Sequence, residues 1–566
     1  MLKMKDAASE LVWLLADEGV QHLFFNPGTD TAPVQEALAA ARAARSPHPS
    51  SVLCLHEHVA LSAAIAHHAL SGRPQALQVH VDAGTLNVGG ALHNAQRNRT
   101  PVVVMAGRSP YSTDPAVPGH RDNPIQWPQE EPDQAASMRA YGRWVMEVPR
   151  GRELGRIVRR AFQVAQSEPR GPAYVMLPRE SLMDPPAAER FPRLRPPRPP
   201  APDPGGLAEV AAALAGAARP VIVTATTGRT PAAVASLARI AELLGAPVID
   251  QRDRFNLPIR HPLYAGGLAG DGFLREADCV LVLDTDVPWV PAAAAPPASA
   301  TIVQVDIDPA KVTMPSWAFP VAVAVEADSA LALPMLESAL AAHATSERRA
   351  AWRSRCDDVA GRLREIHEAW RRRAESEAPA DLPDAHLAAL ERALPRDAVV
   401  LEEAVTNRPA CGRQVDREPG AFISSGAPSL GWALGAGLGA ALAAPGRPVV
   451  AVCGDGSFHF GIPTAALWSA HRAGAPFLTV VLDNGGYYAS KRPVVGLYPE
   501  GASVAAGRFP ETEITDAPDI VAIARACGGD GAVVSRPGEM AAAVEAGLAT
   551  VRAGRCAVVD VKLPWP

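Results

Sequence analysis

Short apolar runs alternate with longer Ala-rich stretches along most of the chain. Runs such as 52–55, 101–106, 279–283 and 448–453 are continuous and rich in Val and Leu. Uninterrupted apolar runs of this length are typical of strands buried on both faces, and the amphipathic stretches between them are typical of covering helices. The alternation therefore predicts an α/β fold in which parallel sheets carry helices on both faces.

Two seams divide this pattern into three blocks. The first is the Pro- and Arg-rich stretch 183–206, which is too dense in proline for a helix and suits an inter-domain connection. The second runs from about 342 to 383, where a charged helix precedes Pro379 and Pro383. We predict three doubly wound parallel-sheet domains, with the boundaries 1–186, 203–342 and 380–566.

Composition and charge exclude several classes of function. A chain of 566 residues is too long for one core, and its net charge of −6 leaves no basic footprint for nucleic acid or a membrane surface. No apolar run is long enough to span a bilayer, and the N-terminus shows no cleavable signal pattern. The seven cysteines include no CxxC pair, which favours reduced thiols. We expect a cytoplasmic protein with a small-molecule substrate.

Two polar turns follow predicted strands in the third block. The run 448–453 leads into Gly454-Asp455-Gly456-Ser457, and the run 476–482 leads into Asp483-Asn484-Gly485-Gly486. A strand that ends in Gly-Asp-Gly turns sharply and leaves a carboxylate at a helix start, where backbone N–H groups suit an anion. One carboxylate, one amide oxygen and a few backbone carbonyls are typical Mg²⁺ ligands. The paired turns predict a metal and phosphate site with Asp455 and Asn484 as ligands.

The first block carries a second set of candidate residues. Asn26-Pro27-Gly28-Thr29 forms a strand-to-helix turn, Glu57 opens a helix, and His80 comes before a Gly84-Thr85-Leu86-Asn87 turn. Taken alone, Glu57 is explained by the favourable interaction of a carboxylate with a helix N-terminus. An isolated His at a strand end is likewise more often structural than catalytic. The combination of these motifs in this order is what indicates a site.

These motifs resemble the thiamine-diphosphate enzymes of the acetolactate synthase, pyruvate decarboxylase and benzoylformate decarboxylase family. The resemblance covers nearly the whole chain in the family's order of pyrimidine-binding, central and diphosphate-binding domains, and the first block is nearest to benzoylformate decarboxylase. It implies thiamine diphosphate and Mg²⁺ as cofactors. It also implies a homodimer or homotetramer whose active sites lie between the pyrimidine-binding domain of one subunit and the diphosphate-binding domain of another.

The resemblance implies catalytic roles for three residues of the first block. Glu57 would hydrogen-bond N1′ of the cofactor's aminopyrimidine and so promote carbanion formation at the thiazolium C2. His80 would relay protons to intermediates, and the Thr29 hydroxyl would contact the substrate carboxylate. His56 and His58 flank Glu57 and point different ways on the helix, so at most one is expected to face the cofactor.

In the third block the resemblance implies most of the cofactor-binding residues. Leu430 would be the apolar wedge that bends the cofactor, while Glu403 and Thr406 would border the diphosphate, although helix capping explains both as well. Asp483 departs from the family's paired Asn-Asn and could alter the electrostatics near the metal. The expected cofactor-binding set is Glu57, Leu430, Pro428, Gly454, Gly456, Ser457, Glu403 and Thr406, and the expected metal ligands are Asp455, Asn484 and the carbonyl oxygen of Gly486.

The expected reaction is the decarboxylation of a 2-oxo acid, as in benzoylformate decarboxylase, with or without carboligation of the enamine intermediate. One alternative is an acetolactate synthase-like carboligase that forms a 2-hydroxy-3-oxo acid. Another is a non-catalytic paralogue that serves as a binding or assembly subunit, although the intact Glu57, Asp455 and Asn484 argue against it. A flavin- or nicotinamide-linked oxidoreductase has little support, because the middle block lacks a GxGxxG loop after a strand, and FAD is not favoured.

Overall fold

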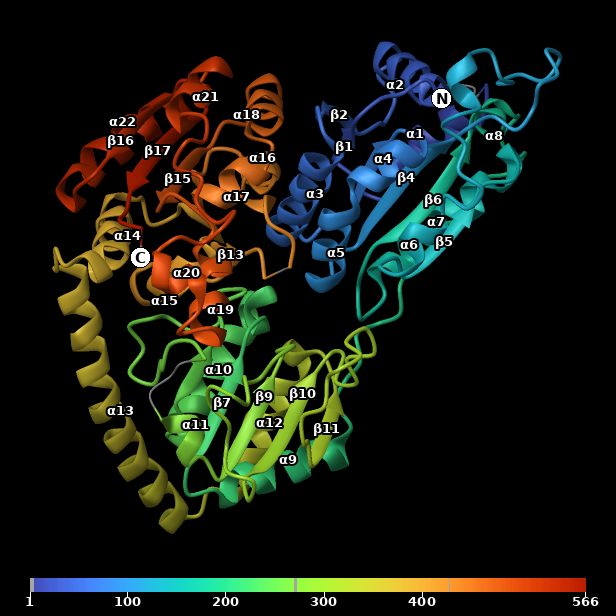
Figure 1. The fold of residues 1–566 in the computed structure, drawn as a ribbon. Coiled ribbons are helices and arrows are strands. Elements are labelled where there is room, and N and C mark those ends of the chain that lie inside the picture. The colour runs from blue at the N-terminus through green and yellow to red at the C-terminus, as the bar shows by residue number, and fades with distance from the viewer. Residues whose placement is uncertain (1–4, 269–271, 427, 566) are drawn as a thin grey trace.

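The computed structural model describes residues 5–268, 272–426 and 428–565 and folds them into three α/β units (Figure 1). Each unit contains one sheet, and all strand pairs assigned within the described residues are parallel. The expected fold class of three doubly wound parallel-sheet domains is confirmed. Each sheet lies inside one of the three residue ranges predicted as domains.

The first sheet has the strand order β2-β1-β3-β4-β6-β5. One core cluster packs α3 against one face, and a second packs α1, α2 and α7 against the other. The strands are β1 (His22–Phe25), β2 (Ser50–Leu53), β3 (Gln75–Val79), β4 (Val102–Arg108), β5 (Trp144–Glu147) and β6 (Ala173–Pro178). The helices are α1 (Ala7–Asp17), α2 (Ala32–Ala43), α3 (Glu57–Ser71), α4 (Val81–Asn87), α5 (Gly89–Arg97), α6 (Ala136–Arg139), α7 (Leu154–Gln166) and α8 (Arg179–Met183).

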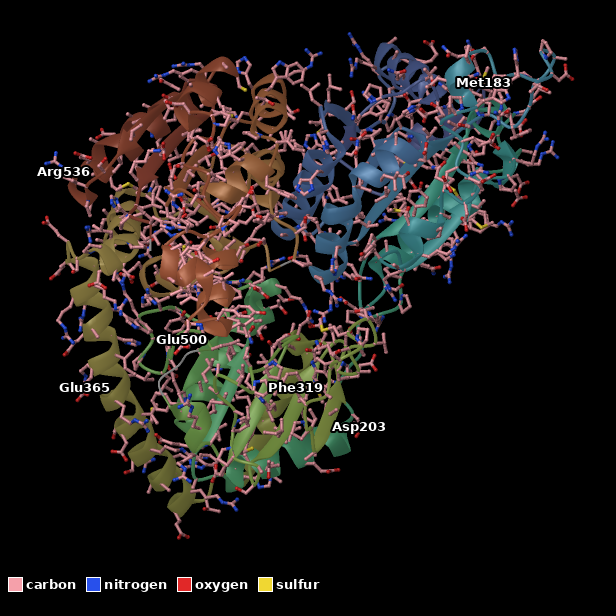
Figure 2. All side chains as sticks on the ribbon, viewed as in Figure 1. Met183, Asp203, Phe319, Glu365, Glu500 and Arg536 are labelled. Atoms are coloured by element: carbon pink, nitrogen blue, oxygen red, sulfur yellow. The ribbon has the colours of Figure 1, made fainter. Side chains whose placement is uncertain are left out.

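The central sheet has the order β11-β10-β9-β7-β8. Its strands are β7 (Pro220–Thr224), β8 (Val248–Asp250), β9 (Cys279–Leu283), β10 (Thr301–Asp306) and β11 (Val323–Glu326). Its helices are α9 (Pro204–Gly216), α10 (Pro231–Leu244), α11 (Phe273–Glu276) and α12 (Ser329–His343). The long charged helix α13 (Ser346–Ala374) then leads to the third unit, and the exposed Glu365 marks it in Figure 2.

The third sheet has the order β13-β12-β14-β15-β17-β16. Its strands are β12 (Val399–Glu403), β13 (Phe422–Ser424), β14 (Val449–Gly454), β15 (Leu478–Asp483), β16 (Asp530–Val534) and β17 (Ala557–Lys562). Its helices are α14 (Leu382–Ala393), α15 (Arg408–Gln414), α16 (Trp432–Ala443), α17 (Asp455–Phe460), α18 (Pro463–Arg472), α19 (Tyr488–Leu497), α20 (Ala502–Ala506), α21 (Ile520–Ala526) and α22 (Met540–Arg552).

The Pro-rich connection lies between Met183, at the end of α8, and Asp203, the N-cap residue of α9. Figure 2 labels both residues and shows that the connection runs from the far end of the first unit to the central unit. Between Asp184 and Asp203 no helix or strand is assigned, as the proline density predicts. The side chain of Asp203 accepts a hydrogen bond from the Gly206 N–H at 2.7 Å, which caps the first helix of the central unit.

Helices α3 and α16 bring the first and third units together within one chain (Figure 1). Helix α16 is almost entirely buried, and its glycines allow a close approach: a Cβ on Gly439 would lie 1.9 Å from the Ala63 carbonyl oxygen, and one on Gly435 would lie 2.8 Å from that of Val59. Both helices belong to one continuous apolar core cluster. Small residues at this contact therefore fix the relative position of the first and third units within one chain.

One local expectation is wrong. Residues 84–87 were expected to form a turn after His80, but they lie in the short helix α4. The Gly84 N–H donates to the His80 carbonyl oxygen at 2.6 Å, and the Thr85 hydroxyl donates to that of Val81 at 2.6 Å. Within the described part of the chain, no helix is both long and apolar enough to cross a membrane.

Candidate active site

The carboxylate of Glu57 lies at the start of α3, where the first sheet presents the carboxyl ends of its strands. Its side chain is buried, and both of its oxygens accept hydrogen bonds from amides: Oε1 from Asn26 at 2.8 Å and Oε2 from Asn87 at 3.0 Å. A Cβ on Gly84 would approach Oε1 to 3.0 Å, so the helix α4 closes tightly over the carboxylate. Glu57 is thus held in one orientation by contacts from two separate segments, the turn after β1 and helix α4.

The two histidines beside Glu57 have different environments. The His56 side chain caps α3 by accepting a hydrogen bond from the His58 N–H at 3.1 Å. His58 is buried against the third unit, where its ring lies 6.3 Å from that of Phe460. Burial lowers the pKa of His58 to about 4, so its ring is neutral near pH 7. Of the two, His58 is the one that faces the third unit.

His80 directly follows β3, as the N-cap residue of α4, and makes a side-chain contact that the sequence did not suggest. Its Nδ1 forms a short hydrogen bond with Oδ1 of Asp30, a buried carboxylate in the turn after β1. Strands β1 and β3 are neighbours in the sheet, which places the two residues side by side. Thr29, in the same turn, is exposed, and its carbonyl oxygen accepts a 3.5 Å hydrogen bond from Arg179. The turn therefore brings Thr29 and His80 to one edge of the sheet.

Asp455, Asn484 and Gly486 come together at the carboxyl ends of the neighbouring strands β14 and β15. One terminal amide atom of Asn484 lies 3.0 Å from the carbonyl oxygen of Gly486 and 3.1 Å from Oδ1 of Asp455. With nitrogen in that place, the amide donates to both oxygens. With oxygen in that place, three oxygens converge, and only a cation between them would stabilise the arrangement.

Two further observations fit a metal and a diphosphate at these turns. Oδ2 of Asp455 is buried and finds no hydrogen-bond partner among the described residues, and burial raises the pKa of this carboxyl to about 7. A Cβ on Gly454 would have none of the described atoms within 4 Å, so a ligand can approach that backbone closely. No cluster of three or more His, Cys, Asp and Glu side chains that could hold a metal occurs in the described ranges, so a cation here needs the amide and carbonyl oxygens.

Asp483 is neutralised by a lysine from the last strand. Lys562 of β17 forms a short ion pair with Asp483 and a second ion pair, at 2.8 Å, with Asp560. Burial alone would raise the pKa of Asp483, but the hydrogen bond from Lys562 and that from the Gly485 N–H hold it below its ordinary value. Asp483, which stands where the family usually has Asn, is therefore paired with a cation, Lys562.

Glu403 caps the buried helix α16. Its two oxygens accept hydrogen bonds from the Trp432 and Ala433 N–H groups, at 3.2 and 2.8 Å. Helix capping, one of the two roles that the sequence left open, thus accounts for the side-chain contacts of Glu403 in this structure. A contact between Glu403 and the cofactor stays a prediction. Thr406 follows in a short 3₁₀ segment, and the Ser457 hydroxyl donates to the Glu403 carbonyl oxygen at 3.4 Å.

The segment 428–430 contacts the first unit of the same chain. Pro428 is exposed, and Ser429 and Leu430 are partly buried directly before α16. Ser429 is bound through its backbone to the side chain of Asn94 on helix α5 of the first unit. The residue beside Leu430 is therefore held by the unit that carries Glu57, a contact that the sequence did not indicate.

The fold and this divided site define a class of enzyme that binds a diphosphate-bearing cofactor between two α/β domains. Sequence models of the thiamine pyrophosphate enzymes match all three units: the N-terminal TPP binding domain at 5–137, the central domain at 207–336 and the C-terminal TPP binding domain at 410–561. The chain belongs to the thiamine pyrophosphate (thiamine diphosphate) enzyme family, whose members related to this chain include decarboxylases and synthases.

Individual relatives agree with this assignment. Benzoylformate decarboxylase from Pseudomonas aeruginosa is 28% identical over 504 residues, which cover 86% of this chain and 87% of that protein. The acetolactate synthase large subunit from Mycobacterium tuberculosis is 29% identical over 517 residues, covering 89% and 87%. The thiamine diphosphate-dependent 4-hydroxybenzoylformate decarboxylase of Rhodococcus jostii RHA1 shares the fold, with a TM-score of 0.78 at 24% identity over 99% of each chain.

Proposed function

We propose that this protein catalyses the thiamine-diphosphate- and Mg²⁺-dependent decarboxylation of a 2-oxo acid. The observation that carries the proposal is the environment of Glu57, a buried carboxylate whose two oxygens are held by the amides of Asn26 and Asn87. A carboxylate fixed in this way suits proton exchange with one ring nitrogen of an aminopyrimidine. The identity to benzoylformate decarboxylase over most of both chains supports the same reaction class.

When bound, the cofactor would supply a carbanion nucleophile for the 2-oxo group and an electron sink for the loss of CO₂. The protein's part is to hold and orient the groups around it. We assign Leu430 and Pro428 to the thiazolium side, and we assign the backbone around Gly454, Gly456 and Ser457 to the diphosphate. We assign Glu403, whose side chain fixes the start of α16, and Thr406 to the border of the diphosphate.

We assign the metal to Asp455, Asn484 and the carbonyl oxygen of Gly486. These three oxygen donors lie within reach of one cation, and a hard ion such as Mg²⁺ takes its remaining ligands from diphosphate oxygens and water. The unpartnered Oδ2 of Asp455 gives the carboxylate a free oxygen for this purpose. The ion pair between Lys562 and Asp483 offsets the charge of the aspartate next to Asn484.

On the substrate side we assign His80 to proton transfer and Thr29 to the substrate carboxylate. Both lie at the edge of the first sheet that also carries Glu57. A carboxylate that leaves water for an apolar site loses CO₂ more readily, because its charge is less well solvated there. The second candidate function is an acetolactate synthase-like carboligation, which the 29% identity to an acetolactate synthase large subunit supports.

We further propose a cytoplasmic homodimer or homotetramer. Three large apolar side chains near the site are at least half exposed in the single chain: Leu55 (50%), Leu86 (63%) and Phe460 (51%). Such side chains beside a functional site are typical of surfaces that a partner covers. Sedimentation at assay concentration tests this assembly, and a monomer with full activity would overturn it.

A substrate screen tests the proposed function. The purified protein is supplied with thiamine diphosphate, Mg²⁺ and a series of aliphatic, branched and aromatic 2-oxo acids, and CO₂, aldehyde and acyloin are recorded separately. Cofactor-dependent CO₂ release with at least one acid is the expected result. Acyloin as the main product would favour the carboligase, and no CO₂ from any acid would overturn the proposal.

A further inference from the structure

The side chains of Asp30 and His80 are hydrogen-bonded, although the two residues are 50 positions apart in the sequence. Asp30 is almost fully buried, whereas a quarter of the His80 side-chain surface is exposed. Oδ1 of Asp30 binds Nδ1 of His80, so Nε2 is the ring nitrogen that remains for a second partner, either the neighbouring Gln129 side chain or a substrate. Oδ2 of Asp30 has no partner among the described residues, which leaves His80 as the cation that balances this buried charge.

Two glycines make room for the pair. A Cβ on Gly28 would lie 2.0 Å from Nδ1 of His80, and a Cβ on Gly107, in strand β4, would lie 1.5 Å from Oδ2 of Asp30. Any other residue at either position would displace the carboxylate or the ring. Gly28 and Asp30 lie in the turn after β1, His80 directly follows β3, and Gly107 lies in β4, so the pair sits at the carboxyl ends of three neighbouring strands.

The groups that face the His80 ring favour its protonated form. The hydrogen bond to Asp30 raises the pKa of His80 above its ordinary value, more than burial lowers it, and Gln129 and Asp82 act in the same direction as Asp30. Asp82 lies in the first turn of α4, and Gln129 lies in the loop after the 3₁₀ turn 124–126.

We infer that Asp30 is a positioning residue that makes His80 the proton donor to the decarboxylated fragment, and that the pair thereby directs the reaction to aldehyde release rather than carboligation. This inference rests on the proposed function and deepens it, because it names the residue pair that decides between the two product classes. If the fragment that remains after CO₂ release is protonated promptly at the carbon that carried the carboxylate, it is released as an aldehyde. If that carbon stays unprotonated, it can attack a second carbonyl compound and form an acyloin.

The proton balance of this step is simple. The N–H bond at Nε2 of His80 breaks, and its proton forms a C–H bond at the carbon that has lost CO₂. The ring becomes neutral and keeps its other proton on Nδ1, where Asp30 accepts the hydrogen bond. Water then returns a proton to Nε2, so that one 2-oxo acid anion and one proton give one aldehyde and one CO₂.

The substitution Asp30→Asn tests the inference, because the Asn oxygen can still accept from Nδ1 while the charge is gone. We expect the aldehyde-to-acyloin ratio to fall about tenfold or more, within the range typical of general acid catalysis. The alkaline limb of the activity profile should move to lower pH by about one unit or more, because a nearby opposite charge raises a histidine pKa by that amount. Asp82→Asn, which removes a carboxylate that does not contact the ring, should have a much smaller effect on both.

A double-mutant comparison separates this role from a structural one. In a His80→Gln background, Asp30→Asn should leave the product ratio unchanged, since Asp30 acts through His80. If Asp30→Asn shifts the ratio equally with and without His80, or shifts neither ratio nor pH profile, the inference is overturned. Asp30→Ser serves as a second variant if Asp30→Asn does not fold, and the same outcomes apply to it.

A measurement without turnover distinguishes failure of the inference from failure of the proposed function. The ring signals of ¹³C-labelled histidines are titrated by NMR, and the signal lost in His80→Gln is assigned to His80. If the wild type decarboxylates no 2-oxo acid, the proposed function is overturned and the product-directing role falls with it. If the acids are turned over but Asp30→Asn leaves the His80 titration unchanged, only the inference is overturned.

Discussion

Asn94 binds Ser429 by two hydrogen bonds that run in opposite directions. The Asn94 side-chain nitrogen donates to the Ser429 carbonyl oxygen at 2.9 Å, and the Ser429 N–H donates to the Asn94 side-chain oxygen at 3.0 Å. Asn94 is fully buried on α5, and a Cβ on Gly90, one turn earlier, would lie 2.4 Å from the Ser429 hydroxyl. This contact joins the unit that carries Glu57 to the segment that carries Leu430.

Replacing Asn94 with Ala should loosen this connection. Two hydrogen bonds at a buried contact are lost, which is expected to lower the free energy of unfolding by about 1–3 kcal/mol. If about 1.4 kcal/mol of this is lost from the cofactor site, the Kd for thiamine diphosphate rises about tenfold. Thermal melts and a cofactor titration by intrinsic fluorescence check both effects.

Gln96→Ala is the matched control for Asn94→Ala. Gln96 lies on the same helix, but its amide donates to the Ala140 and Tyr141 carbonyl oxygens of its own unit, at 3.2 Å each. We expect this variant to bind the cofactor like the wild type. Equal cofactor affinity in both variants would mean that the Asn94–Ser429 contact does not shape the site.

Glu57→Gln should abolish CO₂ release while cofactor and Mg²⁺ binding stay close to those of the wild type. Gln has one acceptor oxygen, so one of the Asn26 and Asn87 amides loses its partner. The larger effect is chemical, because Gln cannot exchange a proton with the aminopyrimidine, and we expect CO₂ release to fall by about 100-fold or more. Single-turnover assays and a cofactor titration measure the two quantities. A variant that retains most of its rate would remove Glu57 from the mechanism.

The sequence predicted the parts of this protein whose signals are local. Strand β14 ends at Gly454 and helix α17 begins at Asp455, and α3 begins at Glu57 as expected, with His56 as its N-cap. Asp455 and Asn484 meet because their strands are neighbours in a parallel sheet, a relationship that follows from the fold class. Local sequence motifs, together with the rule that neighbouring parallel strands end at the same edge of a sheet, were enough to predict these residues.

Residues that depend on distant contacts could not be predicted in the same way. Asp30 resembles an ordinary turn residue until strand pairing brings it to His80, and Asn94 resembles a polar position on a helix until α5 reaches Ser429. Residues 84–87 have a turn-like composition, but burial of Thr85 and its hydrogen bonds favour a helix. Tertiary contacts overrode local preference at that point.

Asp483→Asn should leave the apparent Mg²⁺ affinity within about threefold of the wild type, since the ion pair with Lys562 already offsets the charge of Asp483. Lys562→Met should instead tighten Mg²⁺ binding, because it leaves Asp483 and Asp560 as uncompensated negative charges near the cation site. Activity as a function of Mg²⁺ concentration measures both. Weaker Mg²⁺ binding in Lys562→Met would contradict this account of the charge.

Glu403 should make stability depend on pH in a defined direction. Burial raises the pKa of Glu403 from its ordinary 4.5 to about 8, although the N–H groups of Ala433, Trp432 and Gly431 oppose the rise. Below about pH 4.5 the carboxyl is protonated in both the folded and the unfolded chain. Between about 4.5 and 8 only the unfolded chain releases the proton, so the free energy of unfolding falls as pH rises and levels off above about 8.

Glu403→Gln cannot ionise, and its amide oxygen can still accept one hydrogen bond from the start of α16. The variant should therefore lose less stability than the wild type between pH 5 and pH 8, even if it is less stable at pH 5. Denaturant unfolding at pH 5, 6.5 and 8 measures the slope. Glu36→Gln, at an exposed position on α2, is the control and should keep the wild-type slope. The same slope in Glu403→Gln and the wild type would show that Glu403 is ionised in the folded protein, in which case its carboxylate, rather than a neutral carboxyl group, caps α16.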